Sequence, residues 1–171
     1  MPASAGPSRE PRFRSILLIC AANTARSVMA ERLLIRELAA RGAESLIEVR
    51  SAGIAAYARD GALVSLDTRM ALREDAIAID DEATSTDLKR HPELIDNADL
   101  VLAMTAAQMT DLKARFPAAL TRTVMTLREF AGESGDIEDP VEQGHHAFAD
   151  CRDEIKRLVP IVAARILGDE S

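Results

Sequence analysis

Residues 15–27 read SILLICAANTARS, and the predicted fold is built outward from this stretch. The run Ser15–Ile19 is continuously apolar, which is typical of a strand that is buried on both faces of a sheet. From Arg26 to Arg41 the apolar residues recur along one side of a helix. The pattern therefore predicts a strand, a short loop beginning at Cys20, and a helix. In open parallel sheets, ligands bind at such carboxyl ends of strands.

The loop combines a thiol with groups that bind anions. The amino terminus of a helix carries unpaired N–H groups and a partial positive charge, both of which attract a phosphate or a thiolate. Arg26 lies six residues after Cys20, and its planar fork of donors can bind two phosphate oxygens at once. Positive surroundings also favour the nucleophilic thiolate form of a cysteine. The sequence thus predicts that Cys20 is a nucleophile held in a phosphate-binding loop.

The same spacing occurs a second time in the chain, at Cys151 and Arg157. Cys151 falls on an apolar stripe that runs from Phe148 to Ile166 with the three- and four-residue steps of a buried helix face. An unpaired cysteine in such a place behaves as a small apolar residue. The spacing alone is therefore no evidence of chemistry, and we interpret Cys151 as a core residue.

Residues 20–31, CAANTARSVMAE, resemble the low-molecular-weight protein tyrosine phosphatase family, whose loop usually reads Cys-x-Gly-Asn-x-Cys-Arg-Ser-Pro-x-Ala-Glu. The shared residues are Cys20, Asn23, the pair Arg26 and Ser27, and the closing Ala-Glu. The likeness extends over nearly the whole chain after residue 13. It implies a three-layer α/β/α sandwich with a parallel sheet of four strands, as in phosphotyrosine protein phosphatase I.

Three positions depart from the family pattern. Ala22 replaces a glycine, which would tolerate a positive φ and a close ligand more readily than alanine does. Ala25 replaces a frequent second cysteine, so the disulfide that some relatives form inside this loop is not expected here. Val28 replaces proline.

The resemblance also implies roles for the residues of the loop. Cys20 would attack phosphorus and form a cysteinyl-phosphate, and Arg26 would bind the phosphoryl oxygens, without a metal or another cofactor. Ser51, in a Ser-Ala-Gly turn, would support the loop through hydrogen bonds with Asn23 and Ser27. The residues expected to bind phosphate or to support the loop are Ala21, Ala22, Asn23, Thr24, Ala25, Ser27 and Ser51.

Asp139 is the candidate general acid. Cleavage of a phosphate monoester by a thiolate needs an acid that protonates the departing oxygen. Asp139 precedes Pro140, which restricts the backbone of Asp139 to extended conformations, and the family places its acid in such an Asp-Pro pair before the last helix. Asp136 and Glu138 are rival acids without the proline.

His145 and His146 are adjacent histidines without a third metal ligand, and we interpret them as caps on the solvent side of the last helix.

The substrate pocket is expected to include Thr24, Tyr57 and Val141. The family's usual substrate is phosphotyrosine, and Tyr57 stands where the family commonly has an aromatic residue at the entrance. However, Val141 replaces the aromatic that commonly follows the Asp-Pro pair. Thr24 resembles the branch that removes phosphate from protein arginine, because a short polar residue leaves room for a guanidinium. The resemblance therefore implies a phosphatase of protein phosphotyrosine, and the alternatives are a protein arginine phosphatase, an arsenate reductase-like enzyme and a catalytically weak phosphate-binding protein.

Further strands are predicted at Leu46–Arg50, Ile77–Ile79, Asp99–Thr105 and Thr121–Leu127, the last of them near an edge of the sheet. Helices are predicted at Leu66–Ala76, Pro92–Ala98 and Ala106–Phe116. Strands that alternate with helices indicate parallel βαβ units. Glu82 and Ser85 occupy a stretch in which relatives commonly carry a histidine and an arginine. The support that this histidine and arginine give the loop is therefore not expected in this chain.

The composition sets the broad class of the protein. A chain of 171 residues suits one domain, which we place at 13–171 after a mobile amino-terminal tail at 1–12 that is rich in proline. The net charge of −7 disfavours a general nucleic-acid binder, so the expected partners are phosphorylated proteins, inorganic phosphate and other oxyanions. No apolar run is long enough to span a bilayer, and no membrane partner is expected. Two cysteines, one of them a reactive thiol, favour the cytoplasm.

Overall fold

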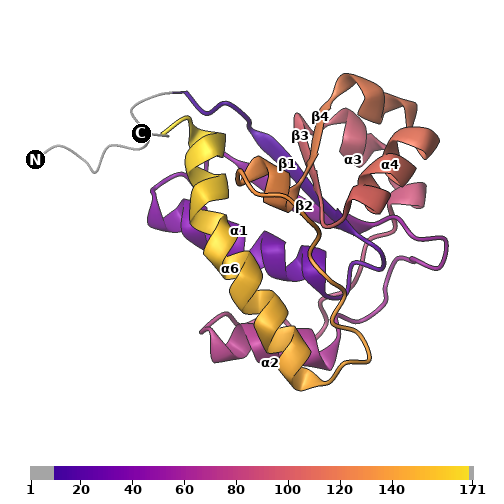
Figure 1. The fold of residues 1–171 in the computed structure, drawn as a ribbon, viewed down its shortest axis with the longest axis vertical. Helices are drawn as coiled ribbons and strands as arrows, with labels where there is room; N and C mark the ends of the chain where they lie inside the picture. The colour runs from indigo at the N-terminus through magenta and orange to yellow at the C-terminus, as the bar shows by residue number, and fades with distance from the viewer. Residues whose placement is uncertain (1–9, 170–171) are drawn as a thin grey trace, which may run out of the picture.

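The computed structural model describes residues 10–169. Its centre is a parallel sheet of four strands in the order β2-β1-β3-β4 (Figure 1). The strands are β1 (Ser15–Cys20), β2 (Glu48–Gly53), β3 (Leu100–Ala103) and β4 (Thr123–Thr126). The chain passes from β1 to β2 on one side and then returns to β3 on the other side, so the end of β1 lies at a topological switch point, where such sheets bind ligands.

Helices cover both faces of the sheet, which confirms the predicted three-layer α/β/α sandwich (Figure 1). The α-helices are α1 (Arg26–Ala40), α2 (Leu66–Glu74), α3 (Glu93–Asp96), α4 (Ala106–Arg115), α5 (Leu127–Phe130) and α6 (His145–Leu167). Two short 3-10 helices are η1 (Leu88–Arg90) and η2 (Pro117–Thr121).

Alternate residues of the central strands point into two separate cores. Ile16, Leu18 and Cys20 of β1 belong to the core that includes buried residues of α1, α2, α5 and α6. Leu17 and Ile19 belong to the core on the other face, with residues of η1, α3, α4 and η2. Burial on both faces explains why β1 is an unbroken apolar run.

Two of the predicted elements differ in the structure by more than one or two residues at their ends. The strand predicted at Ile77–Ile79 is wrong, because this segment has no strand pairing. Ala76 has a positive φ of 62° and Ile77 donates a hydrogen bond back to Leu72 O, so the segment is a turn after α2 whose apolar side chains pack on the core. The second strand begins later than predicted and continues through the Ser-Ala-Gly residues, since Leu18–Cys20 pair with Ser51–Gly53.

Residues 1–9 of the expected mobile tail lie outside the described residues. At residue 12 the chain is attached to the domain, because Arg12 donates its backbone N–H to Ile166 O at 2.8 Å. In the part of the chain that the structure describes, no helix has the length and apolarity to cross a membrane.

Candidate active site

Cys20 is the last residue of β1, and its buried sulfur lies within hydrogen-bonding distance of two groups. The Ser27 Oγ atom is 2.9 Å from Cys20 Sγ, and Asn23 donates its backbone N–H to the same sulfur at 3.3 Å. Helix α1 begins at Arg26, and its N-cap residue Ala25 makes no side-chain capping bond. The first turn of α1 therefore offers N–H groups to an anion that lies beside Cys20.

Asn23 fixes the shape of the loop. Its φ of 60° is a left-handed conformation that asparagine tolerates better than most residues do. Its amide nitrogen donates to Ser27 Oγ and to Ser51 Oγ, both at 2.9 Å, and its amide oxygen accepts the Thr86 N–H at 2.9 Å. Ser51 thus reaches Ser27 through Asn23. Ala22 does not have a positive φ, so the replacement of glycine there strains no backbone angle.

Gly53 lets the loop pack against β2. A Cβ atom on this residue would lie 2.8 Å from the Ala21 carbonyl oxygen and 2.8 Å from the Ala22 carbonyl carbon, which is too close for any side chain. The same strand end holds the loop, because Ile54 donates to Cys20 O and Ala55 donates to Ala21 O. This role of Gly53 was not predicted, although a glycine in the Ser-Ala-Gly sequence could have indicated a close approach of two backbone segments.

Arg26 is buried with only 6% of its side chain exposed, and it links the loop to the acidic segment before α6. Its Nη1 donates to Ile137 O at 2.9 Å, and its Nη2 lies 3.6 Å from Asp139 Oδ2. Asp139 is 46% exposed, and its other oxygen accepts the Val141 N–H. The carboxyl group is therefore held beside Arg26 and is still partly open to solvent in the cleft.

These residues line one cleft of about 220 Å³. It includes each residue predicted for catalysis and each predicted for the substrate pocket, and its lining consists of Cys20, Ala21, Ala22, Thr24, Ala25, Arg26, Tyr57, Asp139 and Val141. Tyr57 and Val141 are exposed at its rim, whereas Asn23, Ser27 and Ser51 lie outside this lining, behind the loop. Among the described residues, no group of three or more His, Cys, Asp or Glu side chains could hold a metal ion.

The rival acids lie elsewhere. Asp136 accepts the backbone N–H of Ala106 at the start of α4, and Glu138 lines a neighbouring cleft. The predicted capping role of the histidines is wrong for His145, because α6 has Gly144 as its N-cap and no side-chain capping bond. His145 instead lies 3.3 Å from both Asp67 and Glu74 of α2.

Ser85 and Glu82 do not contact the loop. Ser85 is buried and bonds to Arg59 O and to the Ala62 N–H, and Glu82 is exposed. Support from this segment comes from the backbone N–H of Thr86, which reaches Asn23. Because the backbone makes this contact, the type of residue at position 86 does not indicate it.

The chain is similar to proteins of one known family. Residues 15–170 match the model of the low molecular weight phosphotyrosine protein phosphatases. The chain belongs to this family. Its members are hydrolases that act on phosphorylated proteins, and the chain shares their α/β fold.

Among its relatives, the phosphatase family member described as a protein-arginine-phosphatase of Geobacillus stearothermophilus is 35% identical over 91% of this chain and 97% of its own length. A probable low molecular weight protein-tyrosine-phosphatase, EpsP of Ralstonia solanacearum, is 32% identical over 90% of this chain and 97% of its own. A solved structure of YwlE arginine phosphatase, a cysteine-to-serine mutant whose active-site serine is phosphorylated, superposes with a TM-score of 0.81 and 31% identity over 91% of this chain and 97% of its own.

Proposed function

We propose that this phosphatase hydrolyses phosphorylated protein side chains through a cysteinyl-phosphate on Cys20, without a metal. The observation that carries the proposal is the position of Cys20 Sγ, which ends β1, contacts Ser27 Oγ and the Asn23 N–H, and shares a cleft with Arg26 and Asp139. The amino terminus of α1 and the guanidinium of Arg26, which lines the same cleft, provide the donors that bind a phosphoryl group. The phosphorylated serine of the YwlE relative supports a covalent intermediate in such a site.

In the first step, the Cys20 thiolate donates an electron pair to phosphorus and forms an S–P bond. The bond from phosphorus to the leaving oxygen or nitrogen breaks, and Asp139 gives its proton to the departing atom. Arg26 and the N–H groups at the start of α1 bind the equatorial oxygens, where the charge of the transition state is spread.

In the second step, the ionised Asp139 accepts a proton from a water molecule whose oxygen attacks the phosphorus. The S–P bond breaks, inorganic phosphate forms, and Cys20 leaves as a thiolate. Ser27 Oγ, 2.9 Å from Cys20 Sγ, stabilises the departing sulfur through a hydrogen bond.

Protein phosphoarginine is the substrate that the pocket favours. Thr24 lines the cleft with a short polar side chain, which leaves space for a guanidinium group and offers it an oxygen acceptor. Val141 lines the same cleft where an aromatic residue would form a wall for a phenol ring. The relatives described as arginine phosphatases support this assignment.

Phosphotyrosine is the second candidate, and Tyr57 favours it. Its ring lines the cleft and is 71% exposed, so it is free to stack on an aromatic substrate. The family model and the EpsP relative support this alternative.

Two matched phosphopeptides test the proposal. We expect the wild-type chain to hydrolyse a phosphoarginine peptide with a higher kcat/KM than a phosphotyrosine peptide of the same flanking sequence. The Thr24→Ile variant should shift the ratio of the two values towards phosphotyrosine, since isoleucine removes the oxygen acceptor and fills the space. An unchanged ratio would mean that the Thr24 side chain does not select between the two substrates. Saturable phosphate binding with no turnover of either peptide would mean that the chain is a binding protein.

An arsenate reductase would need further cysteines to carry the oxidation. The other cysteine, Cys151, is a buried free thiol, and burial raises its pKa to about 12. This disfavours it as a shuttle, because the thiolate is the reactive form. Two free cysteines, one of them the proposed nucleophile, support the reducing cytoplasm as the place of action.

A further inference from the structure

The backbone of Thr24 is held by the amino terminus of α2, a helix that lies outside the cleft lining. The Thr24 carbonyl oxygen accepts hydrogen bonds from Thr68 Oγ1 at 3.0 Å and from the Ser65 backbone N–H at 3.2 Å. Ser65 is the N-cap of α2, and its Oγ accepts the Thr68 N–H at 3.1 Å. One helix cap therefore contacts Thr24, a loop residue that lines the cleft of Cys20.

The hydroxyl protons of this contact have a defined direction. A hydroxyl group has a single proton, and that of Thr68 is donated to Thr24 O. The short contact of 2.6 Å between Ser65 Oγ and Thr68 Oγ1 must then take its proton from Ser65. Thr68 is fully buried, with 0% of its surface exposed, so water does not compete for these bonds.

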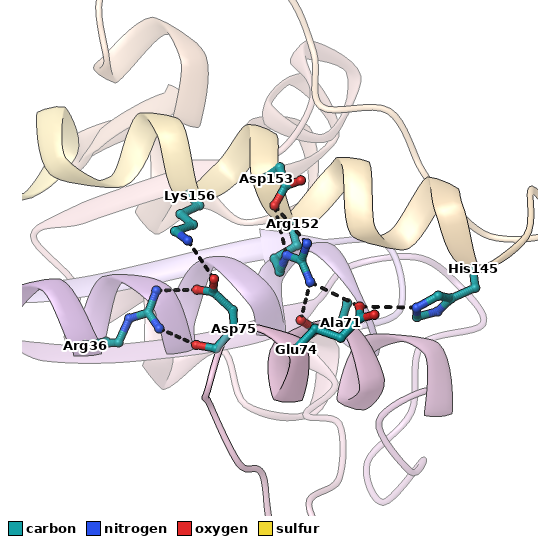
Figure 2. A network of polar contacts seen from close by, with 8 residues as sticks. All are labelled: Arg36, Ala71, Glu74, Asp75, His145, Arg152, Asp153 and Lys156. Atoms are coloured by element: carbon teal, nitrogen blue, oxygen red, sulfur yellow. Dashed lines mark hydrogen bonds and ion pairs between the residues drawn. The ribbon is translucent and has the colours of Figure 1, made fainter.

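Helix α2 is itself held on α1 and α6 by the polar network in Figure 2. Asp75, at the C-cap of α2, is bound by Arg36 of α1 and by Lys156 of α6. Burial alone would raise the pKa of Asp75, but these two cations outweigh burial and lower it.

Arg152 of α6 makes a second link, because it donates to Ala71 O at 2.6 Å and contacts Glu74 at 3.2 Å (Figure 2). These contacts hold the carboxyl-terminal half of α2, and His145 of α6 contacts Asp67 in its first turn, so the helix whose amino terminus bonds to Thr24 is held along its length.

We propose that Thr68 is a positioning residue for substrate selection: its hydroxyl fixes the backbone of Thr24 and so places the side of the pocket that meets the leaving group. This inference rests on the proposed function, in which Thr24 distinguishes phosphoarginine from phosphotyrosine. Thr68 does not line the cleft, and Cys20, Arg26 and Asp139 make none of its contacts described above. Its loss should therefore change which substrate is preferred more than it changes the chemical step.

The test compares Thr68→Val, which removes the hydroxyl and keeps the shape, with Thr68→Ser, which keeps the hydroxyl. We expect Thr68→Val to lower the phosphoarginine-to-phosphotyrosine ratio of kcat/KM by roughly three- to tenfold, the effect of one hydrogen bond. Most of the change should be in KM for the phosphoarginine peptide, and kcat for p-nitrophenyl phosphate should stay within about twofold. Thr68→Ser should restore the ratio. A ratio that is unchanged in Thr68→Val, or equally low in Thr68→Ser, would overturn the proposal.

A double variant tests whether Thr68 acts through Thr24. In a Thr24→Ile background, Thr68→Val should have no further effect on the ratio, because the selective side chain is already gone. An effect of full size in that background would contradict the proposed route. If Thr68→Val does not fold, Ser65→Gly replaces it: glycine is a good N-cap and keeps the N–H, but it removes the hydroxyl that orients Thr68. A fall in the ratio supports the inference, and an unchanged ratio overturns it.

A failure of the proposed function gives a different result from a failure of this inference. If the wild type hydrolyses neither peptide, the proposed function is wrong. The positioning role is then tested by calorimetric affinities of the two peptides. Thr68→Val should weaken the phosphoarginine peptide more than the phosphotyrosine peptide, and equal losses would overturn the inference.

Discussion

The chain carries a cysteine followed six residues later by an arginine in two regions, and the structure gives the two regions opposite properties. Cys20 ends a strand, and its sulfur contacts Ser27 Oγ and the Asn23 N–H. Cys151 lies within α6, where burial raises the pKa of its thiol to about 12. Both sulfurs are buried, so burial does not separate them. What differs is the set of hydrogen-bond partners: in the part of the chain that the structure describes, Cys20 Sγ has two and Cys151 Sγ has none.

The two arginines differ in the same way. Arg26 is buried beside the nucleophile and bonds to Ile137 O. Arg157 is half-exposed and forms a surface ion pair with Glu133, whose pKa it lowers. On a helix, residues six apart point to different sides, whereas the loop bends back and brings Arg26 to the cleft of Cys20. Conformation, and not spacing, makes the first pair a site.

The largest contrast should come from the two cysteines. We expect Cys20→Ser to lower kcat for p-nitrophenyl phosphate by on the order of 10⁴-fold, because a neutral hydroxyl replaces the nucleophilic thiolate. The matched Cys151→Ser should keep kcat within about threefold of wild type, since Cys151 does not line the cleft of Cys20. Steady-state kinetics on the folded variants measures both values. Equal losses in the two variants would show that the regions do not differ as described.

The arginine pair should give the next largest effect. Arg26→Lys should lower kcat by about 10²- to 10³-fold, because an ammonium cannot bind two phosphoryl oxygens with a planar fork. Arg157→Lys keeps a charge that can pair with Glu133 and should leave kcat unchanged. A loss below tenfold in Arg26→Lys, measured with either phosphopeptide, would contradict the assignment of Arg26.

Asp139 and Glu138 form a third, smaller contrast. Asp139→Asn should lower kcat for phosphopeptides by about 10²-fold, since the amide supplies no proton to the leaving group. Glu138→Gln should leave it unchanged, because Glu138 does not line the cleft of Cys20. A loss below tenfold in Asp139→Asn, or an equal loss in Glu138→Gln, would exclude Asp139 as the acid.

The smallest expected effect is on stability alone. Cys151→Ser places a hydroxyl in the hydrophobic core against which α6 packs, and it should lower the free energy of unfolding by about 1–3 kcal/mol. Urea denaturation monitored by circular dichroism would measure this change. Wild-type stability in this variant would mean that the side chain has polar partners in solution and is not a core residue.

The sequence predicted the sheet and the loop because their signals are local, whereas Asp139, Tyr57 and Val141 were predicted from the resemblance to the phosphatase family. An apolar run, a change of period and an Asp-Pro pair are each visible within a few residues of Cys20 or Asp139. The contacts that hold the loop from a distance were not predictable. Thr86 acts through its backbone N–H, and Gly53 acts through the absence of a side chain. Neither contact depends on a residue type that marks function.

The two wrong predictions have the same origin. Ile77 and Ile79 alternate like a strand, but the turn at Ala76 and packing on the core account for their burial. His145 stands at the start of α6 as a cap would, yet its ring faces acidic residues of α2. In both cases tertiary contacts decided the outcome, and a single sequence does not display them.

In the proposed reaction, Cys20 alone carries the phosphoryl group during turnover. The direct measurement uses Asp139→Asn with p-nitrophenyl phosphate, whose leaving group departs without an acid, so the intermediate should form and persist because its hydrolysis lacks a base. After a rapid quench and digestion, mass spectrometry should find one phosphoryl group per chain, on the Cys20 peptide and absent from the Cys151 peptide. A phosphoryl group on any other residue, or steady turnover with no phosphorylated peptide, would show that Cys20 is not the nucleophile.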